Sequence, residues 1–262
     1  MEGGAELRDQ RWGRMAGILW QAGLRAILPA RCSGCGVITD TAHALCSDCW
    51  SVLRFISDPH CVCCGYPFEL ASDDGTISPD GLLCGNCIRQ MPVYDRARSA
   101  LVYDDHSRNY ILRFKHGDRT DMAPVLARWM MQAGRDIWPD ADMILPVPLH
   151  ATRLLYRRFN QSGLLAQALS CQTGLPFYPD LLVRKRRTRS LAGLGAASRR
   201  KVVSGAFEIR ARVAERVGLD GARVVLIDDV LTTGATVAAC SRALKRAGAM
   251  QVDVVTVARV VR

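Results

Sequence analysis

The sequence predicts an α/β protein with a mainly parallel, Rossmann-like sheet, preceded by a small cysteine-rich module. Two observations predict the sheet: apolar runs such as Val224–Ile227 have the β-branched bias of buried parallel strands, and helical patterns lie between these runs. A third predicts the module, because nine of the eleven cysteines lie between Cys32 and Cys87. With 262 residues and 49% apolar content, the chain has room for one medium domain and a small one.

Periodicity and punctuation place the elements of the α/β part. Each strand is a short apolar run, and each helix repeats apolar residues every three or four positions. Gly134 and Gly248 mark helix ends. The expected strands are Ala100–Tyr103, Met143–Leu145, Val224–Ile227 and 251–260; the expected helices are Asp105–Lys115, Asp121–Gln132, Leu164–Leu169 and Val237–Ala247.

The start of the chain favours a cytoplasmic protein without a membrane span. Residues 1–21 mix acidic and basic side chains and lack the basic-then-apolar order of a secretory signal. No run of about 18 uncharged apolar residues occurs, as a spanning helix requires. Residues 1–30 predict a helical leader, because apolar residues recur at roughly helical spacing before Pro29.

Positive charge is concentrated in the second part of the chain. Residues 1–100 hold 9 Lys and Arg against 11 Asp and Glu, a net −2, so residues 101–262 carry +12 and the whole chain +10. Such an excess suits an anionic ligand or nucleic acid. General solubility explains the same excess, and net charge alone does not separate the two.

Four Cys-x2-Cys pairs predict two zinc sites in residues 31–92. Two thiolates separated by two residues bind one tetrahedral Zn²⁺, and a second pair completes a structural site without an open position for water. Sequential pairing is the simplest arrangement; a crossed pairing and a redox role are the alternatives. Cys63 is left over, and His43 and His60 are candidate substitute ligands, but we expect Cys63 to be a small buried thiol and the two histidines to be surface imidazoles. The expected ligands are Cys32, Cys35, Cys46, Cys49, Cys61, Cys64, Cys84 and Cys87.

Val224–Thr236 is the most informative stretch, because an apolar strand leads through two acids, Asp228 and Asp229, into a hydroxyl-rich turn and a helix. Unpaired N–H groups and the helix dipole favour a phosphate at such a helix start, and Gly234 allows close approach. The acids oppose a phosphate unless they bind a ribose diol or Mg²⁺. Phosphoribosyl pyrophosphate (PRPP) meets both demands. An ordinary strand–turn–helix with acidic N-cap residues is the alternative.

The same stretch resembles the PRPP loop of type I phosphoribosyltransferases. The resemblance implies that Asp228 and Asp229 are catalytic residues on the ribose diol and its Mg²⁺, that the turn binds the 5-phosphate, and that Pro146–Leu149 supports pyrophosphate. The expected PRPP-binding residues are Asp228, Asp229, Val230, Leu231, Thr232, Thr233, Gly234, Ala235, Thr236, Pro146, Val147, Pro148, Arg153, Arg157 and Lys115.

Three further motifs narrow the resemblance: Pro146-Val-Pro-Leu-His150, Arg157-x-Phe-Asn-Gln161 and Phe114-Lys-His116. With the cysteine pairs, they resemble the ComF family of competence-type proteins, which carry a double zinc ribbon (here 31–92) before a phosphoribosyltransferase domain (93–262). The resemblance implies a role in DNA uptake during natural transformation, with PRPP and an unidentified acceptor as partners. Arg158, Leu191 and Val202 depart from the family pattern at positions that bear on base recognition and loop closure.

Residues 181–209 contain two basic clusters separated by small residues, which predicts either a mobile flap over pyrophosphate or a solvated hairpin. The rival to an enzyme is an adaptor, in which zinc ribbon and basic flap contact single-stranded DNA or a helicase partner. Against it, the flap offers only Phe207 for base stacking, with Tyr178 just before it. A purely structural zinc module leaves Asp228 and Asp229 without a role.

Overall fold

The computed structural model describes residues 29–41, 44–68, 81–116, 119–149, 159–185 and 205–261. The leader expected in residues 1–30, His43, the Arg153 and Arg157 segment, and most of the flap lie outside these ranges, as do Arg158, Leu191 and Val202. Contacts divide the chain into two compact units, Met1–Val52 and Leu53–Arg262. The division of the sequence at residues 30 and 92 stays a prediction. In the part of the chain that is described, no helix has the length and apolarity needed to cross a membrane.

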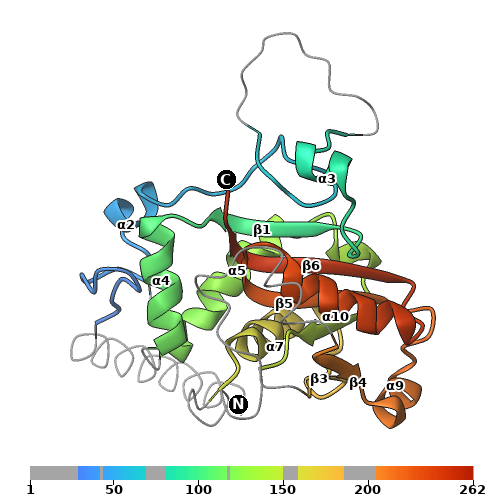
Figure 1. The fold of residues 1–262 in the computed structure, drawn as a ribbon. Coiled ribbons are helices and arrows are strands. Elements are labelled where there is room, and N and C mark those ends of the chain that lie inside the picture. Colours follow the sequence, from blue (N-terminus) through green and yellow to red (C-terminus); the bar gives the residue numbers. More distant parts are fainter. Residues whose placement is uncertain are drawn as a thin grey trace, which may run out of the picture. The chain divides into compact units, whose positions relative to one another are not determined.

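Four parallel strands form the sheet of the second unit, in the order β1-β6-β5-β2 (Figure 1). Nearly all their residues are buried on both faces, which explains why the strands read as near-continuous runs of Val, Ile and Leu rather than as alternating patterns. An isolated parallel bridge between Ile144 and Phe177 extends the sheet beyond β2. The strands are β1 (Ala97–Val102), β2 (Met143–Pro146), β5 (Arg223–Leu231) and β6 (Gln251–Arg259).

The ladder on the two sides of β5 ends at different residues. On one side, β2 stops at the pair Pro146–Ile227; on the other, β6 continues to the pair Leu231–Arg259. The strand therefore does not end before the acids, as the sequence predicted, but carries them as its sixth and seventh residues. Beyond Ile227 the ladder between β2 and β5 has ended, so side chains and loops, and not a neighbouring strand, lie beside this part of β5.

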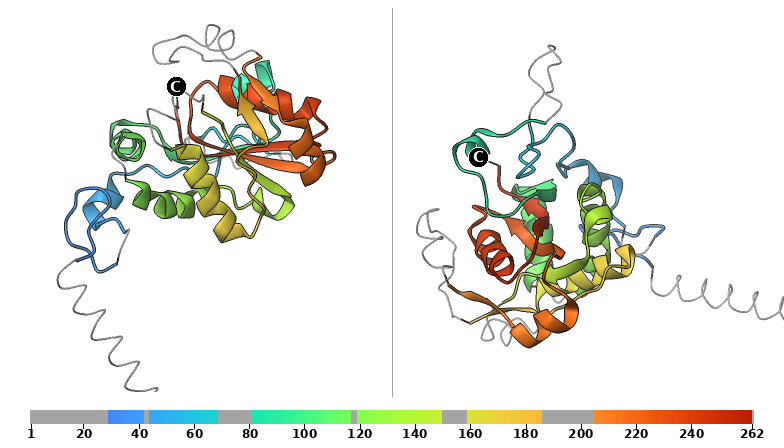
Figure 2. Two further views of the ribbon diagram at one scale, coloured as in Figure 1. Left: turned by 90° about the horizontal axis from the view of Figure 1, so that it is seen from below. Right: turned by 90° about the vertical axis from the view of Figure 1, so that its right-hand side faces the viewer.

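Helices cover both faces of the sheet (Figure 2). α5 (Ala123–Ala133) and α7 (Gln161–Thr173) pack together on one face, whereas α10 (Ala235–Arg246) packs on the other. The chain leaving β2 thus goes to one face and the chain leaving β5 goes to the other. In open parallel sheets, ligands bind outside the carboxyl ends of strands where this divergence occurs.

The remaining elements connect or extend this core. α4 (Asp105–His116) buries Tyr110, Ile111 and Phe114, the three residues expected on its apolar side. The ends of the expected flap pair as two antiparallel strands, β3 (Leu182–Arg184) and β4 (Phe207–Ile209), whose bounds the sequence did not predict. The short elements of this unit are α3 (Gly85–Arg89), η1 (Thr120–Met122), η2 (Trp138–Asp140) and α9 (Ala211–Val217). The first unit contains the short helix α2 (Ser47–Ser51).

The segment that carries the second pair of cysteine knuckles is built onto the free edge of β1. The Ile56 N–H donates to Ala100 O at 2.9 Å, and the Ala97 N–H donates to Cys63 O at 2.7 Å. Gly65 has a φ of 69°, and a Cβ at this position would lie 2.4 Å from Ala97 O. Only glycine fits this turn, so the knuckle packs directly on the first strand of the sheet.

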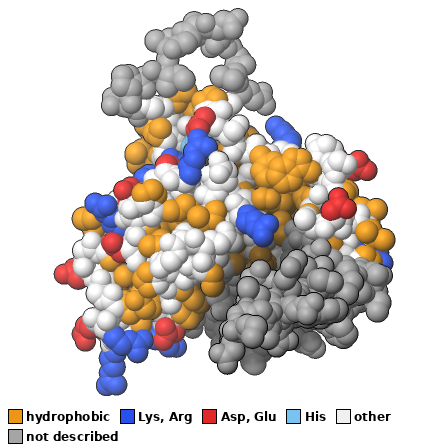
Figure 3. Space-filling model, turned by 180° about the vertical axis from the view of Figure 1, so that it is seen from behind, with side chains coloured by type: hydrophobic (Ala, Val, Ile, Leu, Met, Phe, Trp, Pro, Cys, Tyr) orange, Lys and Arg blue, Asp and Glu red, His pale blue; other side chains and the backbone are white. Residues whose placement is uncertain are grey.

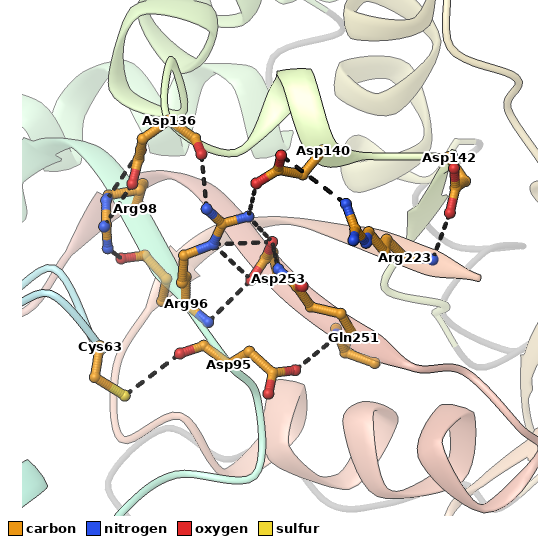
Figure 4. A network of polar contacts seen from close by, with 12 residues as sticks. Cys63, Asp95, Arg96, Arg98, Asp136, Asp140, Asp142, Arg223, Gln251 and Asp253 are labelled. Atoms are coloured by element: carbon orange, nitrogen blue, oxygen red, sulfur yellow. Dashed lines mark hydrogen bonds and ion pairs between the residues drawn. The ribbon is translucent and has the colours of Figure 1, made fainter. Parts of the chain in front are cut away.

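A network of arginines and aspartates closes the amino edge of the sheet (Figure 4). Arg96 donates from its guanidinium to Asp253, with Nη2–Oδ2 2.7 Å, and to Asp136 O at 2.7 Å. Arg98 holds the Asp136 carboxylate with Nη2–Oδ2 2.6 Å. Asp253 is almost fully buried, and its charge is matched by the fork of Arg96. These arginines therefore hold the acids of this edge and fix the strands.

Candidate functional site

The two acids of the sequence motif lie side by side on β5, where β2 has ended. Ser162 in the first turn of α7 donates its hydroxyl to Asp228 Oδ1 at 3.0 Å, and the Asp229 N–H donates to the same oxygen at 2.9 Å. Asp229 Oδ2 lies 2.9 Å from Lys115 Nζ of α4, and both side chains keep about a fifth of their surface exposed (17% and 19%). The carboxylates are thus held by groups from three elements and remain partly accessible.

The electrostatics of the pair are unequal. Burial, and then the neighbouring charge of Asp229, raise the pKa of Asp228 to about 7, against the opposing effect of Lys115 and Ser162. Among the described residues, Lys115 is the one cation that forms an ion pair with these two adjacent carboxylates, through Asp229, whereas the acids of the amino edge are each matched by an arginine. The site therefore has spare negative charge, which a metal ion or a ring of hydroxyl donors can use.

The turn after β5 leaves its amides open. Gly234 is the N-cap of α10 with a φ of 72°, a left-handed conformation that glycine adopts without strain, and the helix has no side-chain cap. For the N–H groups of Ala235, Thr236 and Val237, no protein acceptor is seen among the described residues. Thr232 and Thr233 are exposed. Free amides, hydroxyls and a helix dipole at one point form a suitable seat for a phosphate.

The end of β2 lies next to the acids. The Val147 N–H donates to Ile227 O at 2.9 Å, one residue before Asp228. Asn160 Nδ2 donates to Val147 O at 3.2 Å, and Gln161 Nε2 donates to Lys115 O at 3.1 Å. Asn160 and Gln161 therefore connect the start of α7 to the β2 turn and to the end of α4 through hydrogen bonds. These two contacts explain why both residues occur in the sequence motif.

The structure brings together most of the residues expected from the sequence. Pro146, Val147, Pro148, Leu231 and Ala235 are buried, so they offer backbone rather than side chains to a ligand. Val230 is half-buried, and its position next to the acids continues the strand. Arg153 and Arg157 lie outside the described residues.

Sequence reasoning missed Ser162. The signal was present, because Ser162 begins the helix that follows the β2 loop and therefore starts at the same edge of the sheet as the acids. Its contact to Asp228 joins residues 66 positions apart. No local pattern specifies such a pair, so only the packing of α7 against β5 shows it.

The first cysteine cluster gathers two sequential knuckles. Cys32, Cys35, Cys46 and Cys49 place their sulfur atoms within 4.8 Å of one another, and Cys35 Sγ lies 3.6 Å from Cys46 Sγ. The N–H groups of Gly34 and Cys46 both donate to Cys32 Sγ at 3.3 Å. Burial opposes ionisation, but backbone donors prevail and lower the pKa of Cys32 to about 6. These are the features of a thiolate ready for a metal.

The second cluster, formed by Cys61, Cys64, Cys84 and Cys87, is fully buried, and its sulfur atoms also lie within 4.8 Å of one another. The Cys64 and Cys84 sulfurs are 3.5 Å apart. A tetrahedron with Zn–S bonds of about 2.3 Å has S–S edges of about 3.8 Å, so both clusters fit Zn²⁺. The grouping follows the sequential pairing, and the crossed alternative is not seen among the described residues.

Cys63 and His60 are not part of either cluster. Cys63 is buried, its sulfur lies 3.6 Å from Asp95 O, and burial raises the pKa of its thiol to about 11. His60 Nδ1 lies 3.0 Å from Asp58 Oδ1, and burial lowers the pKa of the imidazole. The interpretation of Cys63 as a small buried thiol is therefore confirmed.

Comparisons with known proteins agree with this arrangement. A double zinc ribbon domain matches residues 23–88, and a phosphoribosyl transferase domain matches residues 165–261. Competence protein F of Haemophilus influenzae is 31% identical over 237 residues, which cover 87% of this chain and 96% of that protein. The chain belongs to the ComF family.

A second relative in sequence and a solved structure are also similar to this chain. The DNA utilization protein YhgH of Salmonella typhi is also 31% identical, over 87% of this chain and 96% of its own length. Among solved structures, the glutamine PRPP amidotransferase from B. subtilis complexed with ADP and GMP covers 55% of this chain and 30% of that one, with 20% identity and a TM-score of 0.37. The predicted fold class is confirmed: this ComF family member joins an N-terminal double zinc ribbon to a parallel-sheet phosphoribosyltransferase domain.

Proposed function

We propose that this ComF family protein binds Mg²⁺-PRPP at the carboxyl edge of its sheet and transfers the phosphoribosyl group to a nitrogen nucleophile. The acceptor is a base that remains to be identified, and the names of the relatives, competence and DNA utilization, associate the reaction with DNA uptake. The single observation that carries the proposal is that an acid pair, a turn with open amides and the β2 turn meet at one edge.

The chemistry asks for charge stabilisation rather than for a covalent intermediate. The nitrogen of the acceptor forms a bond to ribose C1 while the bond from C1 to pyrophosphate breaks, so pyrophosphate leaves with the electron pair and the acceptor loses a proton. The centre at C1 is oxocarbenium-like, so the protein mainly stabilises charge and holds geometry. Asp228 and Asp229 would hold the ribose diol beneath this centre.

Each part of the site takes one portion of the substrate. The amides of Ala235–Val237 and the hydroxyls of Thr232 and Thr233 would grip the 5-phosphate. The amides of the β2 turn, with Arg153 and Arg157, would support pyrophosphate. The carboxylate oxygens of the acid pair would hold Mg²⁺, because they are the hard ligands that this ion prefers, and the ion would neutralise pyrophosphate charge.

Two features of the site shape this reaction. Lys115 is paired with Asp229, so the pair has to separate or be shared when the diol binds, which would release the ammonium group toward pyrophosphate. The hydroxyl of Thr232 is not a base at neutral pH, so the proton that the attacking nitrogen loses has to go to another basic group of the acceptor or to a base of the flap.

Calorimetry with Mg²⁺-PRPP on the wild type and Asp229→Ala tests the proposal. We expect the wild type to bind and the variant to lose about 100-fold in affinity, because removing one partner of a buried charged contact costs a few kcal/mol. PRPP-dependent pyrophosphate release with a panel of bases then tests turnover. A wild type that releases no heat with Mg²⁺-PRPP contradicts the proposal.

The second candidate is an adaptor that binds single-stranded DNA or a helicase partner, and the +12 charge of residues 101–262 favours it. On the face of the molecule in Figure 3, however, side chains of both signs are interspersed over the described residues. Salt-sensitive oligonucleotide binding without PRPP turnover would support the adaptor.

A further inference from the structure

We propose that Arg259 and Tyr94 are positioning residues that couple the second cysteine cluster to the turn of Thr232–Gly234. Zinc at the cluster and PRPP at the turn would then stabilise each other's binding. This inference rests on the proposed function, because PRPP is the ligand that we assign to the turn.

Arg259 connects the end of β6 to the cluster. Its Nη1 donates to Cys64 O and lies 3.6 Å from Cys64 Sγ, and its guanidinium stacks over the ring of Tyr66 at 5.2 Å. The residue is 7% exposed. Four thiolates around Zn²⁺ carry a net charge of about −2, which is costly inside an apolar core unless a cation lies close. Arg259 supplies that cation from the sheet itself.

The same residue is paired with the start of the phosphate turn. In the ladder, Arg259 is the partner of Leu231, and the Val260 N–H donates to Leu231 O at 2.9 Å. Partners in neighbouring strands present their side chains on the same face of a sheet. The backbone that holds Arg259 against the cluster thus also holds the residue immediately before Thr232.

Tyr94 provides a second path between the two sites. It is 7% exposed and belongs to the same apolar core as the four cysteines and Leu231. Its ring and hydroxyl lie 3.7 Å from the point where a Cβ on Gly234 would stand, and Leu231 Cδ1 lies 3.9 Å from that point. The turn therefore packs against Tyr94 and Leu231, which belong to the same core as the cysteines, and Leu231 is the ladder partner of Arg259.

A cluster that keeps its metal fixes Arg259 and Tyr94, and these in turn fix the turn whose amides face the phosphate. Pre-organisation of a binding loop raises affinity by lowering the ordering cost. Coupling between two binding free energies is reciprocal, so PRPP at the turn must raise the affinity of this cluster for zinc, and we expect slower zinc release as a result. The first cluster belongs to the other compact unit and serves as an internal control.

The test follows zinc release from the full-length, two-zinc protein to a colorimetric chelator, with and without saturating Mg²⁺-PRPP. We expect PRPP to slow one zinc equivalent by about fivefold or more and to leave the other unchanged. Asp229→Ala, whose affinity for PRPP we expect to be about 100-fold lower, controls for direct chelation of zinc by the ligand and should show no slowing at the same PRPP concentration.

Arg259→Met should remove the slowing and weaken PRPP binding by about tenfold, and Arg259→Lys should recover part of both. Arg223→Met, which removes an arginine at the amino edge of the neighbouring strand, should keep the slowing. If Arg259→Met does not fold, Tyr94→Leu decides: it should leave zinc release without PRPP unchanged and lose the protection that PRPP gives.

Calorimetry on the same samples separates the possible failures. If PRPP binds but both zinc equivalents leave at unchanged rates, or if Arg259→Met and Tyr94→Leu retain the protection, the coupling is wrong and the PRPP site stands. If the wild type does not bind PRPP at all, the proposed function is wrong and the coupling falls with it.

Discussion

The two edges of the parallel sheet treat acidic side chains in opposite ways. At the amino edge, Asp253 and Asp136 are each matched by a guanidinium at 2.6–2.7 Å. At the carboxyl edge, Asp228 and Asp229 lie next to each other, and Lys115 is the cation in contact with them. Matched charges hold strands together, whereas unmatched charges leave binding energy for a ligand. We infer that the acids of the amino edge stabilise the sheet, whereas those of the carboxyl edge are available to the proposed ligand.

The largest effect on stability should come from the amino edge. Asp253→Ala leaves the partly buried Arg96 without its main partner and should lower the free energy of unfolding by about 3 kcal/mol. For a domain of this size the melting temperature should fall by roughly 6–12 °C. Thermal denaturation measures the loss, and the affinity of the folded variant for Mg²⁺-PRPP should stay within about twofold. A large loss of affinity would contradict the view that the amino edge contributes to stability but not to PRPP binding.

Asp228→Asn should do the reverse and stabilise the protein. Because the pKa of Asp228 is raised from 3.8 to about 7, the folded state binds more protons than the unfolded state between these pH values, so stability falls as pH rises through this window. Asparagine has the same shape, and its oxygen still accepts from Ser162 and the Asp229 N–H. We expect a gain of ~2 kcal/mol at pH 8, about half the value of the full shift, because the side chain is only half-buried.

Urea unfolding at pH 4 and pH 8 measures this effect, with Asp142→Asn at the exposed amino edge as the control. The wild type and Asp228→Asn should have similar stability at pH 4 and differ at pH 8. Equal stability at both pH values would show that Asp228 ionises without penalty.

The smallest expected effect is that of Ser162→Ala. Loss of the hydroxyl removes one donor to Asp228 and loosens its orientation, so the affinity for Mg²⁺-PRPP should fall by about three- to tenfold, with little change in stability. Ser170→Ala on the same helix, whose hydroxyl donates to Leu175 O, is the matched control and should keep the affinity. Calorimetry compares the two variants, and an equal affinity would remove Ser162 from the site.

The elements of the sheet were predictable because the signals are local. The Val-rich runs of β5 and β6 and the apolar faces of α4 and α5 are patterns within a few residues. The predicted end of β5 at Ile227 was wrong, because β6 continues to pair with β5 as far as Leu231. Because aspartate is disfavoured in strands, the composition predicts that the strand ends before the acids. Pairing with the neighbouring strand β6 outweighs this preference.

For the candidate site, the sequence identified the residue types at the edge but not the contacts between them. Lys115 was expected near pyrophosphate, and its pairing with Asp229 follows only from the packing of α4. The ion pair of Arg96 with Asp253 joins residues 157 positions apart, and Arg259 meets Cys64 across 195. Such contacts depend on strand order and register, which no single segment of the sequence contains.

Hydrogen exchange with and without Mg²⁺-PRPP tests whether PRPP binds at the carboxyl edge of the sheet, because it reports on the amides of both edges in one experiment. If PRPP binds there, we expect added protection at the amides of Leu231–Val237 and of the turn after Pro146. Exchange at Asp95–Arg98 and at Arg223 should be unchanged. Protection at the amino edge, or none at Leu231–Val237 under conditions where PRPP is bound, would contradict it.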